Sequence, residues 1–313
     1  MNVRSVARAL AAPTAALLAL GGVAACSDNG GSRTDPDRVD VVVAFYPLQF
    51  LAEQVGGDAV RVTNLARPGA EPHDLELQPR QVGQIVDAEL IVYLAGFQPA
   101  VDEAVAQNGA DRAFDVAAVQ PLLDAGAGGH QHDGEAGHDD ETGGKDPHVW
   151  LDPTRLATIG DRLAERLGRA DPDRAAEFTA RAAALRADLT KLDTDYAQGL
   201  RTCQQREIVT SHTAFGYLAE RYQLEQVGVS GLSPDAEPSP RRLVEVAEEA
   251  RSHQATTIFF ETLVSPKVAE TVAREVGAKT AVLDPIEGAP ADGDYLSAMR
   301  TNLQTLRTAL GCS

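Results

Sequence analysis

The chain has 313 residues and a formal net charge of −18 at pH 7, because 46 acidic side chains outnumber 28 basic ones. Such an acidic surface repels phosphates and argues against nucleic acid as a partner, but it concentrates cations near the protein. The length is sufficient for two domains of ordinary size.

The first 25 residues have the pattern of a bacterial export signal. Arg4 and Arg8 are the only charged side chains before an apolar run, which ends in small residues directly before Cys26. This order resembles the signal of bacterial lipoproteins, so we predict that residues 1–25 are removed and that Cys26 is lipidated. The protein would then be anchored to the outer face of the cell membrane. An ordinary secretory signal before an incidental cysteine is the alternative.

A tether and a first folded lobe follow the signal. Residues 26–39 are rich in Gly, Asp and Ser and cannot bury enough apolar surface to fold, so they are predicted to be a flexible tether. Residues 40–171 are predicted to form the first lobe. Its expected elements are strands at 40–45, 60–65 and 89–94 and helices at 47–55, 78–88 and 153–168. Strands that alternate with helices predict a mainly parallel sheet.

Two further segments have a distinct composition. Residues 124–147 carry hardly any apolar side chain and are rich in Gly, His and acidic residues, so we predict a mobile loop inserted in the first lobe. Residues 172–200 place their leucines on one face of a helix and contain no internal Pro or Gly before Gly199. A rigid helix of this length would reach along the whole molecule and join two lobes.

The second lobe, residues 201–313, is predicted to repeat the alternation of the first. Its expected elements are strands at 207–210, 257–260 and 280–283 and helices at 214–222, 240–253, 266–276 and 295–310. The predicted fold is therefore two Rossmann-like α/β lobes with mainly parallel sheets, joined by a long rigid helix.

Two cysteines remain beyond Cys26. Cys203 and Cys312 lack the short spacing of metal-binding pairs. In an exported chain such cysteines favour a disulfide, which we predict here, and two free thiols are the alternative.

Three histidines lie where an open α/β sheet places its ligands, just beyond a strand or before a helix. His73 and His212 each follow a predicted strand, and His148 precedes a predicted helix. Each alone is more often a structural residue than a ligand. Together with one oxygen donor they form a tetrahedral set suited to Zn²⁺, whereas two histidines with two carboxylates would favour a harder ion such as Mn²⁺. His253, near the end of a predicted helix, is expected at the surface.

Four segments together resemble a known family. They are AEPHDLELQPRQVGQIVDAELIVYLAG, DPHVWLDP, IVTSHTAFGYLAERY, and FFETLVSPKVAETVAREVG with LDPIEG. In this order they are similar to the cluster A-I metal-binding proteins of ABC importers, the ZnuA-type family, over essentially the whole mature chain. The resemblance implies two α/β lobes joined by a rigid helix, a metal ion between the lobes, and His73, His148 and His212 as its ligands.

The fourth ligand is expected to be Asp284, because the family often uses an acidic residue of the second lobe and Asp284 follows a strand end. Glu71 and a water molecule are the alternatives, and Asp284 could instead cap the turn that follows it. Glu261 could orient one of the ligands, and Trp150 and Phe215 could exclude water from them.

The inserted loop carries His130, His132 and His138 among acidic residues. It resembles the metal-rich loop of zinc-specific members of the family, whose manganese-specific members usually have a carboxylate in place of His212. We predict that the three loop histidines bind zinc more weakly than the main site, because a Gly-rich chain must first be ordered at about 1–2 kcal/mol per residue. A solvated spacer without metal binding is the alternative.

The predicted function is capture of Zn²⁺ between the lobes by an extracytoplasmic solute-binding protein, which delivers the ion to the permease of an ABC importer. A monomer is expected. The alternatives are a Mn²⁺-binding member of the same family and a surface zinc-binding adhesin or buffer. A zinc hydrolase is a weaker alternative, because the sequence has no HExxH pair, Gly-rich phosphate loop or nucleophile elbow, and no enzyme is predicted.

Overall fold

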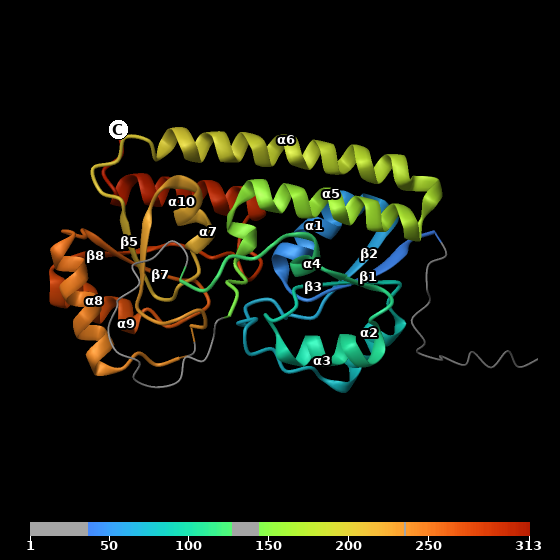
Figure 1. Ribbon diagram of the computed structural model, residues 1–313, viewed down its shortest axis with the longest axis horizontal. Coiled ribbons are helices and arrows are strands. Elements are labelled where there is room, and N and C mark those ends of the chain that lie inside the picture. The colour runs from blue at the N-terminus through green and yellow to red at the C-terminus, as the bar shows by residue number, and fades with distance from the viewer. Residues whose placement is uncertain (1–36, 127–143, 235) are drawn as a thin grey trace, which may run out of the picture. The chain divides into compact units, whose positions relative to one another are not determined.

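The computed structural model describes most of the chain (Figure 1), namely residues 37–126, 144–234 and 236–313. Several predicted features lie outside the described residues: the signal peptide, Cys26, His130, His132 and His138. Within the described ranges, no helix combines the length and the apolar character needed to cross a membrane.

The first lobe is built on a parallel sheet with the strand order β2-β1-β3-β4. Its strands are β1 (Val39–Val43), β2 (Val60–Asn64), β3 (Leu90–Tyr93) and β4 (Ala113–Asp115). Its helices are α1 (Tyr46–Gly56), the 3₁₀ turn η1 (Gly57–Ala59), α2 (Pro79–Asp87), α3 (Pro99–Asn108) and α4 (Val116–Val119). The two inner strands, β1 and β3, are almost wholly buried, as expected for runs of Val, Leu and Ile in a sheet covered on both faces.

The second lobe repeats this topology with the strand order β6-β5-β7-β8, again all parallel. Its strands are β5 (Glu207–Thr210), β6 (Glu225–Gly228), β7 (Thr257–Phe260) and β8 (Lys279–Val282). Its helices are α7 (Gly216–Tyr222), α8 (Pro240–Ser252), α9 (Lys267–Val276) and α10 (Tyr295–Ala309). Four elements, α3, β4, α4 and β6, are absent from the predictions made from the sequence.

One long helix, α6 (Ala175–Gly199), connects the lobes. It follows α5 (Pro153–Ala170) of the first lobe, from which the 3₁₀ turn η3 (Pro172–Arg174) separates it. Figure 1 shows α6 running along α5 and α10, and α6 contacts α1 and α5 of the first lobe and α10 of the second. The Tyr196 hydroxyl on α6 also donates a 2.7 Å hydrogen bond to the Met299 carbonyl on α10. The prediction of two parallel α/β lobes joined by a long helix is confirmed.

The hydrophobic core has two parts. The larger cluster extends from the first sheet through α5 and α6 to α7 and α10, so it crosses from one lobe to the other. The smaller cluster lies in the second lobe between its sheet and the helices α8 and α9. Apolar packing is therefore continuous along α6, from the helices of the first lobe to α7 and α10 of the second.

The predicted disulfide between Cys203 and Cys312 is confirmed. It joins the segment after α6 to the segment after α10 across a sequence separation of 109 residues. Closing a loop of that length restricts the unfolded chain and is worth about 4–5 kcal/mol in the chain-entropy model.

Candidate metal centre

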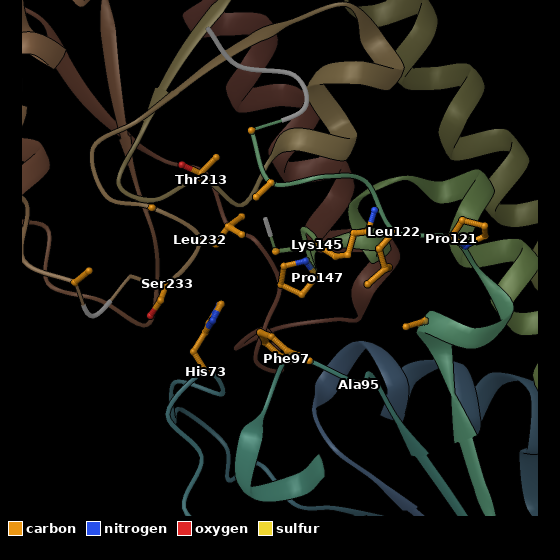
Figure 2. A pocket seen from close by; sticks show the side chains of 17 residues that line it. His73, Ala95, Phe97, Pro121, Leu122, Lys145, Pro147, Thr213, Leu232 and Ser233 are labelled. Carbon is orange, nitrogen blue, oxygen red and sulfur yellow. The ribbon is translucent and has the colours of Figure 1, made fainter. Parts of the chain in front are cut away.

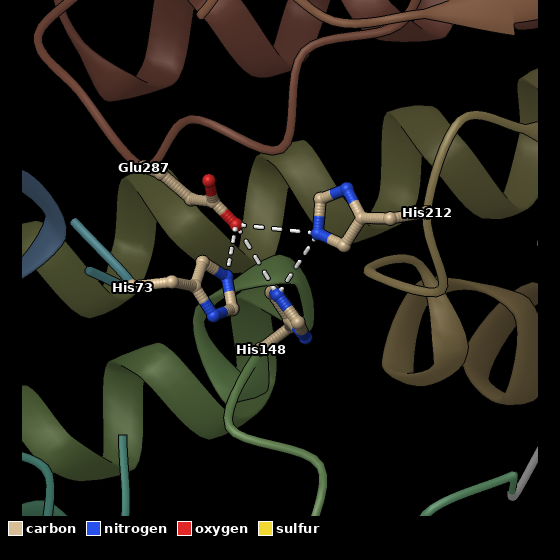
Figure 3. Close-up of side chains that lie close together, drawn as sticks. All are labelled: His73, His148, His212 and Glu287. Carbon is tan, nitrogen blue, oxygen red and sulfur yellow. Dashed lines mark hydrogen bonds and ion pairs between the residues drawn. The ribbon is translucent and has the colours of Figure 1, made fainter. Parts of the chain in front are cut away.

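Three histidines and one glutamate converge between the lobes (Figure 3). The Nε2 atoms of His73 and His148 each lie 3.2 Å from Glu287 Oε1. The Nε2 atom of His212 lies 3.5 Å from the same oxygen and 3.3 Å from His148 Nε2. Each residue therefore presents one donor atom to a common centre.

The fold explains why these four residues meet. His73 lies in the loop after β2, His212 follows β5, and Glu287 lies in the loop after β8. His148 immediately precedes the 3₁₀ turn η2 (Val149–Leu151), which leads into α5. Residues beyond the carboxyl ends of parallel strands gather at one edge of a sheet, and here the two edges supply ligands to the same point.

A carboxylate orients His148, which is fully buried. Asp146 Oδ1 lies 2.7 Å from His148 Nδ1 and accepts a 2.9 Å hydrogen bond from the backbone N–H of His148. An imidazole that donates from Nδ1 keeps the lone pair of Nε2 for a metal ion. The Trp150 ring is buried, and its centroid lies 5.3 Å from that of the His148 imidazole, so apolar surface lies against this side of the centre.

A second carboxylate orients His212 in the same way. Glu261 Oε1 lies 2.6 Å from His212 Nδ1, and the Ser211 hydroxyl donates to the same oxygen. Both His212 and Glu261 are buried. The expectation that Glu261 could orient a ligand agrees with this geometry.

His73 is the most accessible of the four residues. Its side chain is 9% exposed, whereas Glu287 is 1% exposed and His212 is completely buried. It lines a cavity of about 1000 Å³ between the lobes, which Figure 2 shows from close by. Phe97 of the first lobe and Thr213 of the second also line this cavity. Of the four residues of the centre, His73 is the one that borders this cavity.

Asp284 does not belong to the group, and Glu287 occupies the place expected for it, so that prediction was wrong. Asp284 Oδ1 accepts a 2.7 Å hydrogen bond from the Ile286 N–H, and Oδ2 accepts a 3.2 Å hydrogen bond from the Thr262 hydroxyl. Asp284 thus caps the turn after β8. Ile286 has a φ of 58°, which β-branched residues rarely adopt, and this turn directs the next residue, Glu287, toward the histidines.

Glu71, the other acidic alternative, is also outside the group. Its Oε1 accepts a 2.8 Å hydrogen bond from the His73 N–H, which braces the loop that carries His73. Neither Asp146 nor Glu287 was selected from the sequence. Each lies within three residues of a selected residue, His148 or Asp284, so an acidic side chain near these two positions was the available signal.

Four of the six separations among these donor atoms fit a zinc ion. Ligand atoms about 2.0–2.1 Å from the centre of a tetrahedron lie about 3.3–3.4 Å from one another. The four separations given above run from 3.2 to 3.5 Å. Three imidazole nitrogens and one carboxylate oxygen are also donor types that zinc takes. Their lone pairs repel one another unless a cation or protons lie between them, so the arrangement favours a bound cation.

Protons compete with a metal ion for these donors. Burial acts to lower the pKa of His212, but hydrogen bonds to Glu261 and Glu287 outweigh it and raise that pKa to about 10. Burial likewise opposes the charged form of His148, yet Asp146 raises the pKa of His148. Burial lowers the pKa of His73. The hydrogen bonds from the histidines overcome burial and hold the pKa of Glu287 well below its usual range.

The sequence is similar to those of known zinc-binding and zinc-uptake proteins. The family model described as "Zinc-uptake complex component A periplasmic" (ZnuA) matches residues 41–309. The zinc-binding lipoprotein AdcA of Streptococcus pneumoniae is 36% identical over 295 residues, which cover 90% of this chain and 57% of AdcA. The high-affinity zinc uptake system protein ZnuA of Bacillus subtilis is 34% identical over 298 residues, which cover 92% of this chain and 93% of that protein.

The fold is also similar to that of a solved structure. The Zn(II)-bound ZnuA-like domain of Streptococcus pneumoniae AdcA has a TM-score of 0.72 and 34% identity, covering 87% of this chain and 99% of that domain. The chain therefore spans a little over half the length of whole AdcA, and the matched part contains the ZnuA-like domain.

Proposed function

Because the chain belongs to the ZnuA family of zinc-uptake components, we propose that it is an extracytoplasmic solute-binding protein that carries Zn²⁺ to the permease of an ABC importer. One observation carries the proposal. His73, His148, His212 and Glu287 present four donor atoms to one centre, and four of the six separations among these atoms are those of a zinc tetrahedron.

The donor set supports zinc over manganese as the cargo. Mn²⁺ prefers carboxylate, carbonyl and water oxygens, whereas imidazole suits zinc. Three of the four donors here are imidazole nitrogens, and two of them belong to rings whose other nitrogen is held by Asp146 or Glu261. Because these two rings are held in place, they cannot easily move apart to give the longer metal–ligand distances of a larger ion.

Binding rather than catalysis is the role that this centre supports. Catalytic zinc sites have three protein ligands and keep one position open for water or substrate. Here Glu287 takes the fourth position, so a zinc ion held by all four residues has no open position for a reacting water. We therefore propose a carrier and no hydrolase.

The location and partners of the protein form part of the same proposal. Residues 1–25 act as an export signal, and Cys26 carries a lipid that anchors the protein to the outer face of the cell membrane. The name "zinc-binding lipoprotein" of the pneumococcal relative supports this anchor. The segment between Cys26 and β1, which begins at Val39 and so ends the tether one residue earlier than predicted, then lets a monomeric protein reach the permease.

Metal analysis tests the proposal most directly. Protein purified without added metal is expected to contain zinc in preference to manganese, and competition with a chelator should give a tight 1:1 zinc complex. Cells that lack the gene should grow poorly only when zinc is scarce and recover when zinc is added. A protein that binds no zinc, or that prefers manganese under equal supply, would refute the assignment.

Zinc binding is expected to release protons and to strengthen as the pH rises. The pKa of about 10 at His212 means that the metal-free protein holds a proton there at pH 7, and zinc must displace it. Below that pKa, the affinity should rise about tenfold per pH unit for each proton displaced. Calorimetry at pH 7 in buffers of different ionisation enthalpy measures the protons released. A count of zero with a flat affinity between pH 6 and 8 would contradict the expected competition.

Deletion of residues 126–144 is expected to leave the tight site intact and to remove weaker additional zinc binding. The insertion is closed at its base, because the Ala125 N–H bonds to the Gly144 carbonyl at 2.9 Å and the Asp146 N–H bonds to the Leu123 carbonyl at 2.9 Å. The four proposed ligands all lie outside the deleted segment. Equilibrium dialysis counts the bound ions. Loss of the tight site would show that the insertion supplies a primary ligand.

A substitution variant is the control for this deletion. Changing His130, His132 and His138 together to serine keeps the length of the insertion and removes only its imidazoles. Loss of the same weak binding in both variants assigns that binding to the histidines. Loss in the deletion alone assigns it to the acidic residues of the insertion.

A further inference from the structure

Tyr217 ties together two segments that lie far apart in the sequence. It belongs to α7, five residues after His212, and its side chain is buried. Its hydroxyl donates a 2.8 Å hydrogen bond to the Asp146 carbonyl and accepts a 2.8 Å hydrogen bond from the Leu123 N–H. Leu123 and Asp146 stand on either side of residues 124–145. One phenol of the second lobe therefore holds both sides of this junction in the first lobe.

Asp146 connects this junction to the metal centre. Its carboxylate lies 2.7 Å from His148 Nδ1, while its carbonyl accepts the hydroxyl of Tyr217. A displacement of that carbonyl would also displace the carboxylate and the ring that it orients. His212 stands just before α7, so Tyr217 couples the two ligands whose Nε2 atoms lie 3.3 Å apart.

The ring of Tyr217 is itself held in place. The guanidinium carbon of Arg155 lies 5.0 Å from the ring centroid, where the negative face of an aromatic ring attracts a cation. Arg155 also donates a 2.9 Å hydrogen bond to the Pro121 carbonyl. With its ring covered on one face and its hydroxyl bonded twice, Tyr217 is well placed to fix the position of Asp146.

We propose that Tyr217 is a positioning residue, which acts through Asp146 to hold His148 and His212 at the spacing that zinc requires. The proposal rests on the proposed zinc-binding function and adds to it a residue that does not touch the metal. Without the hydroxyl, the Leu123 N–H loses its hydrogen-bond acceptor and the Asp146 carbonyl loses a hydrogen-bond donor. A buried polar group left unpaired costs about 1–3 kcal/mol, so the segment is expected to shift to regain partners.

The substitution Tyr217→Phe tests this role. We expect the Kd for Zn²⁺ to rise about tenfold, the lower end of the 10–100-fold range for residues that orient metal ligands. The visible absorption of the Co²⁺-loaded protein should also change, because its bands report the geometry of the coordinating atoms. This spectrum comes only from folded, metal-bound protein, so a general loss of stability would not alter it.

Tyr222→Phe is the matched control. Tyr222 lies on the same helix and is also buried, and its hydroxyl donates a 3.1 Å hydrogen bond to Asp193, away from the metal centre. We expect this variant to keep the wild-type Kd and Co²⁺ spectrum. A loss equal to that of Tyr217→Phe would overturn the proposal, because it would show a general effect of removing a buried hydroxyl from α7.

A double-mutant cycle tests the path through Asp146. If Tyr217 acts through Asp146, the variant that combines Tyr217→Phe with Asp146→Asn should lose less affinity than the product of the two single losses. Independent effects in the cycle, or a Tyr217→Phe variant with the wild-type Kd and spectrum, would refute the positioning role. A wild-type protein that binds neither Zn²⁺ nor Co²⁺ would instead refute the proposed function, so the two failures are distinguishable.

Discussion

Replacing Glu287 by glutamine is expected to raise the Kd for Zn²⁺ by about 10²–10³-fold. Structural zinc sites bind with about 10–16 kcal/mol in total, so one ligand of four contributes roughly 3–4 kcal/mol, and each 1.4 kcal/mol is a factor of ten. Glutamine keeps the size of the side chain but removes the negative charge that faces three imidazoles. Chelator competition, which reaches low Kd values, measures the loss.

Asp284→Asn is the matched control, because it removes one negative charge from the same loop. The Asp284 carboxylate accepts hydrogen bonds from the Ile286 N–H and the Thr262 hydroxyl, and an amide oxygen can still accept one of them. The zinc Kd is expected to stay within about threefold of wild type, because asparagine can still accept from the Ile286 N–H and keep the turn that directs Glu287. A large loss in Asp284→Asn with none in Glu287→Gln would restore Asp284 as the fourth ligand.

Alanine at His148 or His212 is expected to weaken zinc binding by about 10³-fold or more, and alanine at His73 by about 10²-fold. All three changes remove one ligand. Alanine at either buried histidine also deprives Asp146 or Glu261 of its imidazole partner, and a buried carboxylate that loses a charge-assisted hydrogen bond is destabilised. His73 lines the cavity, so a water molecule can replace its nitrogen more easily.

His253→Ala controls for the loss of a histidine as such. His253 is a surface residue, as predicted, whose side chain is 38% exposed and whose Nδ1 lies 3.0 Å from Glu207 Oε2. Its removal should leave the tight site unchanged by calorimetry and by chelator competition. Wild-type affinity in all three of the other alanine variants would refute the proposed metal centre, and equal losses in all three would refute the special position of His73.

The convergence of the three histidines proposed as ligands could be predicted from the sequence because their positions depend on local patterns. His212 follows a short strand with Ile and Val at its centre, and the segment around His148 leads into a helix that begins at a proline. In a parallel α/β sheet such positions converge at the carboxyl edge whatever the details of packing. The same alternation of strands and helices predicted the two lobes, and the uninterrupted helical segment predicted α6.

Short elements of mixed composition could not be predicted in this way. β4 has three residues, and β6 (Glu225–Gly228) contains a single aliphatic side chain. Each forms because a neighbouring strand offers its backbone groups, β3 to β4 and β5 to β6. A pairing partner that lies elsewhere in the sequence leaves no periodic pattern in the strand itself.

The choice between Asp284 and Glu287 was decided by the tertiary structure alone. Both are acidic, both follow β8, and they are three residues apart. Asp284 turns back to cap its own loop, and the positive φ of Ile286 then turns Glu287 toward the histidines. Ile286 can hold that unusual backbone conformation because its side chain is completely buried, and burial depends on residues distant in the sequence. Local patterns place a ligand at the end of a strand, but packing around the turn selects which side chain reaches the metal.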